Sequence, residues 1–433
     1  MIRCGIHEAN ITPALGMEIP GYFETRLADG VRDELFAEAV YFESGDSRAV
    51  SRAISRAVLI SCDAIQIPME SCDRVRSVLA ERLGAAPENI LVCATHSHTA
   101  GPVETWGDFV HLNPDYMRFL ENRMIDGACL AAQGAREVRL SFASETEDRI
   151  AYYRDYVSPD GTYRTWGGEG YVPFGEIDPE VGVLRIDSAD GIPYGVIVNY
   201  ACHCDCVGGS SYSADYPGEM RRALRRLYGE SFMPVFVNGF CGNINHVDPK
   251  GFHREVPEHY KRMGRMLAAD ASRAFELAVR PFEDESVAGA MTVLEIPSRV
   301  PDASHLAFAD QVEKNPDAGI MDRFYAQEIR RTDAEGVKTL PVPVQVLRVG
   351  EAAFFGMPGE IFAEFGRMLK ERSPIPHAMP VNLANGAYGY VPTRELVQPG
   401  IYEASVGMSN RLDIEAGYRM TDELIRLAET IRL

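Results

Sequence analysis

The sequence has no apolar run that approaches the roughly 18 to 20 residues needed to span a bilayer. Its first residues, MIRCGIHEANITPALG, also lack the charged, then apolar, then small-residue layout of a secretory signal peptide. We therefore expect no transmembrane segment and a cytoplasmic location.

Positive charge is scarce relative to negative charge. The 433 residues include 63 Asp and Glu but 43 Lys and Arg, which gives a formal net charge of −20. Because nucleic-acid binding depends on basic side chains that neutralise phosphates, we expect no DNA or RNA partner. The nine cysteines are an odd number and thinly spread, apart from CHCDC at 202–206, so they do not indicate a disulfide framework.

Hydrophobic residues make up 46% of the chain, which is enough for one large core or two ordinary ones. Strand and helix patterns alternate without the regular spacing of a doubly wound sheet or a barrel. This predicts an α/β fold of the layered α+β kind, with mixed sheets flanked by helices. No Pro- or Ser-rich linker divides the chain, so we expect a single domain over 1–433. The short repeat SRAVSRAISRAV at 47–58 predicts a solvated element or an extended hairpin, without an assigned function.

Four apolar stretches predict buried strands that end in polar or glycine-rich turns: ILVCAT at 90–95, PYGVIVNYAC at 193–202, PVFVNGF at 234–240 and EAAFFGM at 351–357. Four amphipathic stretches predict helices that cover the sheets: 114–133, 217–229 with Asp215 as N-cap, 257–279 and 414–433. Functional loops are expected where the strands end.

Two histidines, His96 and His98, follow ILVCAT in the stretch THSHTAGP. In an extended strand a spacing of two points both imidazoles to the same face, where one metal ion can meet one or both. Such pairs also occur as hydrogen-bonded residues at strand ends, so the motif alone allows both interpretations.

His203 ends the apolar run GVIVNYAC and lies within CHCDC. Thiolates also bind zinc, which makes the neighbouring cysteines rival ligands. Cys202, Cys204 and Cys206 alternate with His203, so in a strand their thiols would face away from its imidazole. We interpret His203 as a ligand and the thiols as packing groups.

Two later turns carry a carboxylate and several tyrosines. In MPGEIFAEFG a Pro-Gly turn precedes Glu360, which is predicted to begin a helix, where negative charge is favoured. Simple helix capping is the alternative to a binding role. The loop NGAYGYVPTRELVQPGIYE carries Tyr388, Tyr390 and Tyr402, and aromatic residues in such loops either pack or bind ligands.

Taken in this order, the segments resemble the neutral (non-lysosomal) ceramidase family, a group of zinc-dependent amidases. THSHTAGP is similar to the family's Thr-His-x-His-x-Gly-Pro, which implies that His96 binds zinc and that His98 acts near the substrate. The resemblance implies three further zinc ligands: His203 after its strand, Glu360 in MPGEIF and Tyr390 in GYVPT. It therefore implies the family's catalytic-domain fold and a Zn²⁺ cofactor.

The resemblance extends to about residue 405 and implies further site residues. Tyr402, twelve residues after Tyr390, matches a tyrosine that contacts the reacting group, and Arg154 in YYRDY matches a substrate-contacting arginine. The family's Gly-Asp-Val-Ser-Pro-Asn corresponds to GNINHV, with Asn245 in place of the serine near the scissile amide and His246 in place of the proline. A mechanism that requires that serine is excluded, and Asn245 is expected to orient the substrate. His246 is either a further acid or base or a surface histidine.

The chain ends in a predicted helix soon after the last motif, so we expect no counterpart of the family's C-terminal β-sandwich, and we expect a smaller, more polar substrate than a membrane lipid. We predict a zinc-dependent hydrolase in which activated water attacks an amide (N-acyl) bond. His98 would handle the proton, and Tyr402 or Arg154 would stabilise the oxyanion.

Two alternatives stay open. The same zinc site could hydrolyse an ester, lactam or glycosidic bond, and for sugars Trp106 and Trp166 could stack on the rings. Alternatively, the chain could be a non-catalytic descendant that keeps the metal for structure. The expected partner is a small-molecule substrate, and a homo-oligomer is not excluded.

Overall fold

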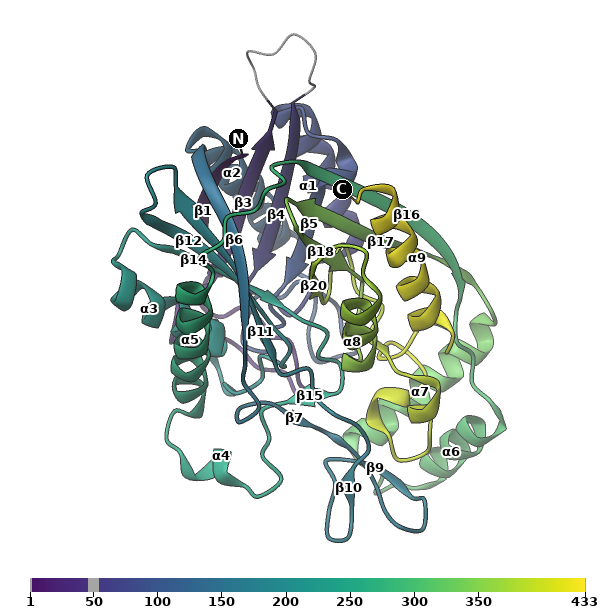
Figure 1. Ribbon diagram of the computed structural model, residues 1–433. Helices are drawn as coiled ribbons and strands as arrows, with labels where there is room; N and C mark the ends of the chain where they lie inside the picture. The colour runs from purple at the N-terminus through teal and green to yellow at the C-terminus, as the bar shows by residue number, and fades with distance from the viewer. Residues whose placement is uncertain (1, 46–53, 433) are drawn as a thin grey trace.

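The structure is a computed structural model that describes residues 2–45 and 54–432. The repeat element expected at 47–58 lies largely outside the described residues, and its last part, from Ser55, begins strand β4. Within the described part of the chain, no helix is both long enough and apolar enough to cross a bilayer. Figure 1 shows how the elements are arranged.

Eight strands form one mixed sheet in the order β14-β12-β11-β6-β1-β3-β4-β5. In that order they span Met233–Asn238, Pro193–Tyr200, Glu180–Ser188, Arg136–Thr146, Ile2–Asn10, Phe36–Ser44, Ser55–Cys62 and Ile90–Ala94. The outer pairs β12–β14 and β4–β5 are parallel and the inner pairs are antiparallel. The Asn238 side chain at the end of β14 donates to the Thr95 carbonyl after β5 (2.9 Å), so the sheet curls until its two edges meet.

A second sheet, in the order β16-β17-β18-β20, packs on the first. Its strands span Val287–Pro297, Thr339–Val349, Ala352–Gly356 and His377–Val381. Apolar side chains from both sheets, including Val40, Phe42, Leu347 and Phe354, are fully buried between them. Burial of this interface is the main source of stability at the centre of the fold.

Helices cover the outer faces of both sheets (Figure 1). α1 (Met69–Leu83) and α2 (Pro114–Gln133) lie over the half with β1, β3 and β5, whereas α3 (Asp215–Tyr228) and α5 (His259–Leu277) lie over β6, β11 and β14. α8 (Ala363–Arg372) and α9 (Ala416–Thr430) cover the second sheet. The predicted α+β fold with mixed sheets and flanking helices is confirmed.

The remaining elements are short or peripheral. α4 (Phe252–Glu255), α6 (Ala303–Lys314) and α7 (Ile320–Glu335) lie toward the lower end of Figure 1. The short strands are β2 (Gly30–Val31), β7 (Tyr152–Tyr153), β8 (Asp155–Val157), β9 (Tyr163–Thr165), β10 (Val172–Pro173), β13 (Ser211–Tyr212), β15 (Ile244–Asn245), β19 (Glu360–Ile361) and β21 (Tyr390–Val391).

The helix predicted at 217–229 differs at its start, because Asp215 is its first residue and Ala214 its N-cap. Asp215 has a left-handed backbone (φ 55°), and its carboxylate accepts hydrogen bonds from the amides of Cys206 and Val207 (2.8 and 2.9 Å). The Asp215 side chain therefore stabilises the loop after β12 instead of serving only as a helix cap.

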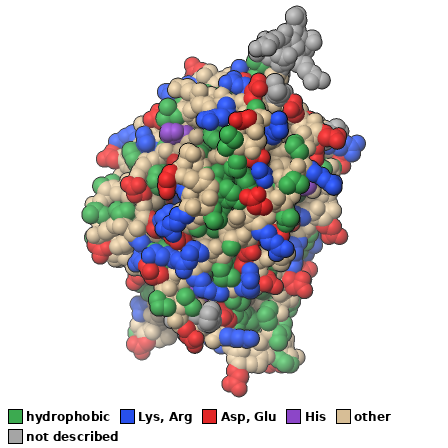
Figure 2. All heavy atoms as spheres, turned by 60° about the vertical axis from the view of Figure 1, so that its left-hand side comes forward, with side chains coloured by type: hydrophobic (Ala, Val, Ile, Leu, Met, Phe, Trp, Pro, Cys, Tyr) green, Lys and Arg blue, Asp and Glu red, His purple; other side chains and the backbone are tan. Residues whose placement is uncertain are grey.

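The basic run of α3, RRALRR at 221–226, is neutralised by acidic neighbours. Its arginines pair with Glu38, Asp63, Asp33, Glu219 and Glu8. Figure 2 shows the face turned forward from the left-hand side of Figure 1, where Lys and Arg are interspersed with Asp and Glu. This face therefore carries charge of both signs in close mixture.

Three of the parallel strand pairs belong to βαβ units, and these units position the site. They are β4-α1-β5, β12-α3-β14 and β18-α8-β20. Open α/β sheets bind ligands beyond the carboxyl ends of their parallel strands. The segments that follow these strand ends carry His96, His203, Asn245 and Glu360.

Candidate metal centre

The loops after the parallel strands are tied together by backbone hydrogen bonds. The His98 amide donates to the Cys204 carbonyl (3.1 Å), the His203 amide to Ile244 (3.2 Å), and the Asn382 amide to Asn238 (2.9 Å). These hydrogen bonds connect segments that are far apart in the chain. The predicted site residues on these loops meet in space.

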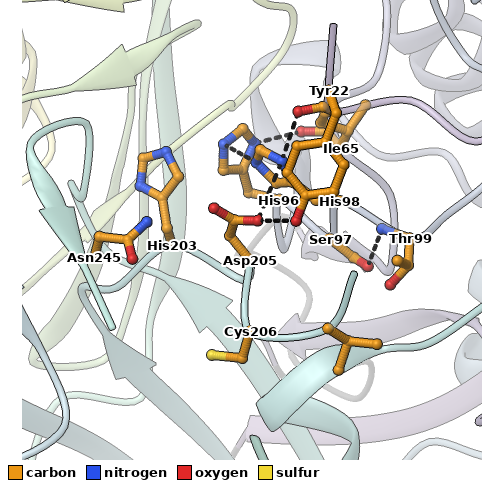
Figure 3. Close-up of polar contacts among 12 residues, drawn as sticks. Tyr22, Ile65, His96, Ser97, His98, Thr99, His203, Asp205, Cys206 and Asn245 are labelled. Carbon is orange, nitrogen blue, oxygen red and sulfur yellow. Dashed lines mark hydrogen bonds and ion pairs between the residues drawn. The ribbon is translucent and has the colours of Figure 1, made fainter. Parts of the chain in front are cut away.

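His96 and His98 do not lie in a strand, contrary to our prediction, because β5 ends at Ala94. His96 instead has a left-handed backbone (φ 72°), a strained conformation for a residue with a side chain. The two rings nevertheless lie edge to face, with centroids 4.7 Å apart and Nε2 atoms 3.2 Å apart (Figure 3). A turn, not strand alternation, brings them together.

His203 also lies beyond its strand, since β12 ends at Tyr200. We predicted that strand alternation turns the three thiols away from the His203 imidazole. This reason is wrong, because His203 and the cysteines follow the strand. Cys202 and Cys204 are buried, and burial holds the pKa of each thiol well above its ordinary value. The Cys206 sulfur lies 3.2 Å from that of Met263. The environment of these thiols is that of packing groups.

Glu360 lies in the two-residue strand β19 and not at a helix start, since α8 begins at Ala363. β19 pairs in parallel with β21, which places Glu360 directly opposite Tyr390. The Glu360 Oε2 atom lies 3.2 Å from Nε2 of His96 and 3.2 Å from Nε2 of His203. Burial acts to raise the pKa of this carboxyl, but the two imidazoles outweigh it and hold the pKa well below its usual value.

The outward nitrogens of all three histidines contact backbone carbonyls. Nδ1 of His96 lies 2.9 Å from the Ile65 oxygen, Nδ1 of His98 3.1 Å from the Gly21 oxygen, and Nδ1 of His203 2.8 Å from the Cys241 oxygen. A carbonyl only accepts, so each Nδ1 carries the hydrogen and, in the neutral ring, each Nε2 presents a lone pair. This is the arrangement that orients histidines toward a metal.

The donor set fits a metal ion. Nε2 of His98 lies 3.2 Å from Nε2 of His96, and the buried Glu360 Oε2 atom has no hydrogen-bond partner. A cation between these atoms would supply the partner that the buried Glu360 oxygen lacks. Nitrogen ligands of His96, His98 and His203 all lie within 4.8 Å of one another, and this is the one such group among residues 2–45 and 54–432.

Tyr390, Tyr402 and Arg154 surround this group. The Tyr390 ring lies 6.4 Å from the His203 ring and 5.7 Å from the Tyr402 ring, centroid to centroid. Burial raises the pKa of both phenols well above the ordinary value, which favours the protonated form of each. Arg154 is buried, with Nη1 3.5 Å from the His203 Nε2 atom, and its Nε donates to Glu403.

Asn245 lies beside His203 (Figure 3) because the His203 amide binds the carbonyl of the residue before Asn245. Its Nδ2 is buried without a hydrogen-bond partner, which leaves a free donor. His246 is half-buried, and its ring packs near those of His253 and His259 (centroids 5.7 and 5.8 Å). Burial lowers the pKa of His246 to about 4.

Two residues of the centre, Tyr22 and Asp205, were missed by the sequence analysis. The Tyr22 hydroxyl donates to Asp205 Oδ1 (2.5 Å), which lies 3.7 Å from Nδ1 of His98 (Figure 3). Gly21 makes room for this arrangement, because a Cβ on it would lie 2.7 Å from the same His98 nitrogen. A glycine directly before a tyrosine was the signal that could have drawn attention to the segment.

A cavity of about 500 Å³ opens at the candidate metal ligands. Its walls are largely apolar and include Phe23, Val103 and Trp106, while Gln66 and Glu104 form a polar part of the lining. Trp106 stacks on Phe324 with centroids 5.2 Å apart. Trp166 is half exposed and is not among the residues that line the cavity.

Comparisons with known proteins show the fold. No family model and no curated relative matches the sequence. Neutral ceramidase from Pseudomonas aeruginosa has a similar structure, with a TM-score of 0.76 and 18% identity over 99% of this chain and 74% of that one. A ceramidase complexed with C2 has the same TM-score and identity over 100% of this chain and 75% of the other. The predicted ceramidase-like fold is confirmed.

Proposed function

We propose that the protein is a zinc-dependent hydrolase that cleaves an amide (N-acyl) bond in a small substrate. The observation that carries the proposal is the convergence of the histidine Nε2 atoms and the Glu360 oxygen at the cavity. The proposed ligands are His96, His203, Glu360 and Tyr390, a mixed nitrogen and oxygen set that suits zinc and leaves room for a further ligand. The ceramidase-like fold supports the choice of an amide bond.

A zinc ion held there would supply Lewis acidity, which activates water and polarises a carbonyl group. His98 has its Nδ1 fixed on the Gly21 carbonyl, so its Nε2 is free to accept a proton inside the cavity. Burial lowers the pKa of His98 to about 4, which keeps this nitrogen unprotonated near neutral pH.

The remaining side chains provide hydrogen-bond donors. Tyr402 keeps its phenolic hydrogen, and Arg154 keeps its charge because the Glu403 carboxylate, against the cost of burial, holds its pKa well above 12. Either group can stabilise negative charge that develops on a carbonyl oxygen. The unpaired Nδ2 of Asn245 can orient the substrate. In this proposal Asn245 therefore serves as a donor where the ceramidases carry a serine.

The cavity bears on the kind of substrate. Its volume suits a small molecule, and its largely apolar walls favour a substrate with an apolar arm in addition to a polar group. We propose that residues 1–433 act as one catalytic domain on such a substrate.

The test is metal analysis of the protein combined with a hydrolysis screen of amides, esters, lactams and glycosides. We expect one zinc per chain and hydrolysis of amides in preference to the other linkages. His96→Ala and Glu360→Ala should each lose zinc and activity. Full zinc occupancy with unchanged turnover in both variants would contradict the proposal.

A further inference from the structure

A carboxylate lies on the cavity wall close to the candidate metal ligands. Glu104 follows His98 by six residues, lines the cavity and is half-buried. Gln66 donates from Nε2 to Glu104 Oε2 (2.6 Å). Gln66 comes directly after Ile65, whose carbonyl binds Nδ1 of His96, so the Glu104 side chain is held beside the His96 ring.

Glu104 lacks a direct ionic partner among the described residues. Among residues 2–45 and 54–432, Glu104 forms no ion pair. Two more glutamates, Glu360 and Glu70, line the same cavity. Arg411 also lines the cavity, and its guanidinium lies over the Tyr388 ring at 5.4 Å. A partly buried carboxylate without an ion pair is costly. Burial raises the pKa of Glu104 to about 7, and Glu360 adds to this rise while His96 and the Gln66 hydrogen bond oppose it. A cation on a ligand would remove this cost.

Aromatic rings complete the surroundings of Glu104. Trp106 is two residues along the chain and lines the cavity with Phe23, at a centroid distance of 6.1 Å. Val103 precedes Glu104 and is fully buried. Aromatic rings beside a carboxylate attract alkylammonium groups, because the ring faces carry negative potential. A hydroxyl group on a ligand would bind only the carboxylate, whereas an ammonium group would bind both the carboxylate and the aromatic rings.

We infer that Glu104, held by Gln66, binds an ammonium group on the substrate, and that the preferred substrate is an aminoalkyl amide. The second half of this inference rests on the proposed amide hydrolysis, and the first half rests on the cavity alone. Glu104 is therefore a specificity-determining residue, and the cavity distinguishes cationic from neutral amides of the same length.

The test compares three hexanoyl amides that differ at one end: N-(2-aminoethyl)hexanamide, N-(2-hydroxyethyl)hexanamide and N-propylhexanamide. Binding is measured by calorimetry with zinc-free protein, where hydrolysis does not interfere, and hydrolysis is measured with zinc-loaded protein. We expect the amine to bind about 10- to 100-fold more tightly than the propyl compound, as for other hydrogen bonds to charged groups.

Glu104→Gln removes the charge with little change in shape and should reduce this preference to less than about threefold, with binding of the propyl compound unchanged. The matched control is Glu230→Gln, an exposed glutamate outside the cavity, which should keep the preference. Because the readout is a ratio of two affinities in one preparation, a change in the folded fraction does not imitate the result.

Equal binding of the three amides, or a preference that survives in Glu104→Gln, would overturn the inference. Binding of the hydroxyl compound as tightly as the amine would overturn it as well. The proposed function is judged separately: an amine preference in binding without hydrolysis by the zinc-loaded protein would support the role of Glu104 and contradict the hydrolase. Hydrolysis of all three amides at equal kcat/KM would support the hydrolase and contradict the role of Glu104.

Discussion

The two neighbouring histidines should respond differently to replacement by alanine. In the proposed centre His96 is a zinc ligand, with Nε2 3.2 Å from the Glu360 carboxylate, whereas His98 handles a proton. His96→Ala removes one of four ligands. His98→Ala leaves all four in place and removes a proton acceptor. Zinc affinity and turnover should therefore separate in the two variants.

The expected magnitude follows from the ligand count. Four-ligand zinc sites bind with roughly 10–16 kcal/mol, so each ligand contributes about 2.5–4 kcal/mol. His96→Ala should weaken zinc binding by roughly 10²- to 10³-fold. His98→Ala should change zinc affinity by less than about tenfold, while kcat falls by roughly 10²- to 10⁴-fold, as for the loss of a general base.

Both quantities can be measured on the same preparations. Zinc affinity is obtained by competition with a chromophoric chelator, and kcat is obtained at saturating zinc with the best amide of the screen. His7→Ala, in strand β1, is the matched control and should change neither. Equal loss of zinc in His96→Ala and His98→Ala would refute the division of roles, because His98 would then be a ligand.

Three further outcomes are expected. Gly21→Ala should lower kcat at least tenfold with zinc still bound, because the new Cβ would lie 2.7 Å from the His98 ring nitrogen. An unchanged kcat would contradict the fixed position of that ring. Asp215→Asn should lower the free energy of unfolding by about 1–3 kcal/mol in denaturant titrations. Both carboxylate oxygens of Asp215 accept backbone hydrogen bonds, and the single oxygen of an amide cannot replace them. A change below the error of the fit would contradict this role. Burial lowers the pKa of both His246 and His259 to about 4, below the unfolded value of about 6.5. The unfolded state therefore binds more protons in this range, and Tm should fall as pH is lowered from about 6.5 toward 4, less steeply in His246→Ala; an equal slope in that variant would refute the assignment.

The strands could be predicted from the sequence because their signal is local. The stretches at 90–95, 193–202, 234–240 and 351–357 are largely apolar runs, and each overlaps a buried strand of the structure. Such runs are typical of strands covered on both faces. The positions of the segments that follow these strands can therefore be predicted from the sequence.

The conformations within those loops depend on distant partners. Glu360 was expected at a helix start, but its two-residue strand exists because β21, later in the chain, pairs with it. The left-handed turn at His96 depends on the Ala64 and Ile65 carbonyls, which bind its amide and its ring. Glu104 carries no motif and acquires a role only through Gln66 and the cavity. Contacts of this kind have no local signature in the sequence.

The most direct test of the proposed centre is a crystal structure of the protein grown with zinc, with anomalous diffraction measured on both sides of the zinc absorption edge. We expect one strong anomalous peak per chain within bonding distance of Nε2 of His96, Nε2 of His203 and Oε2 of Glu360. A map without a peak at these atoms, or with zinc bound only elsewhere, would contradict the proposed centre.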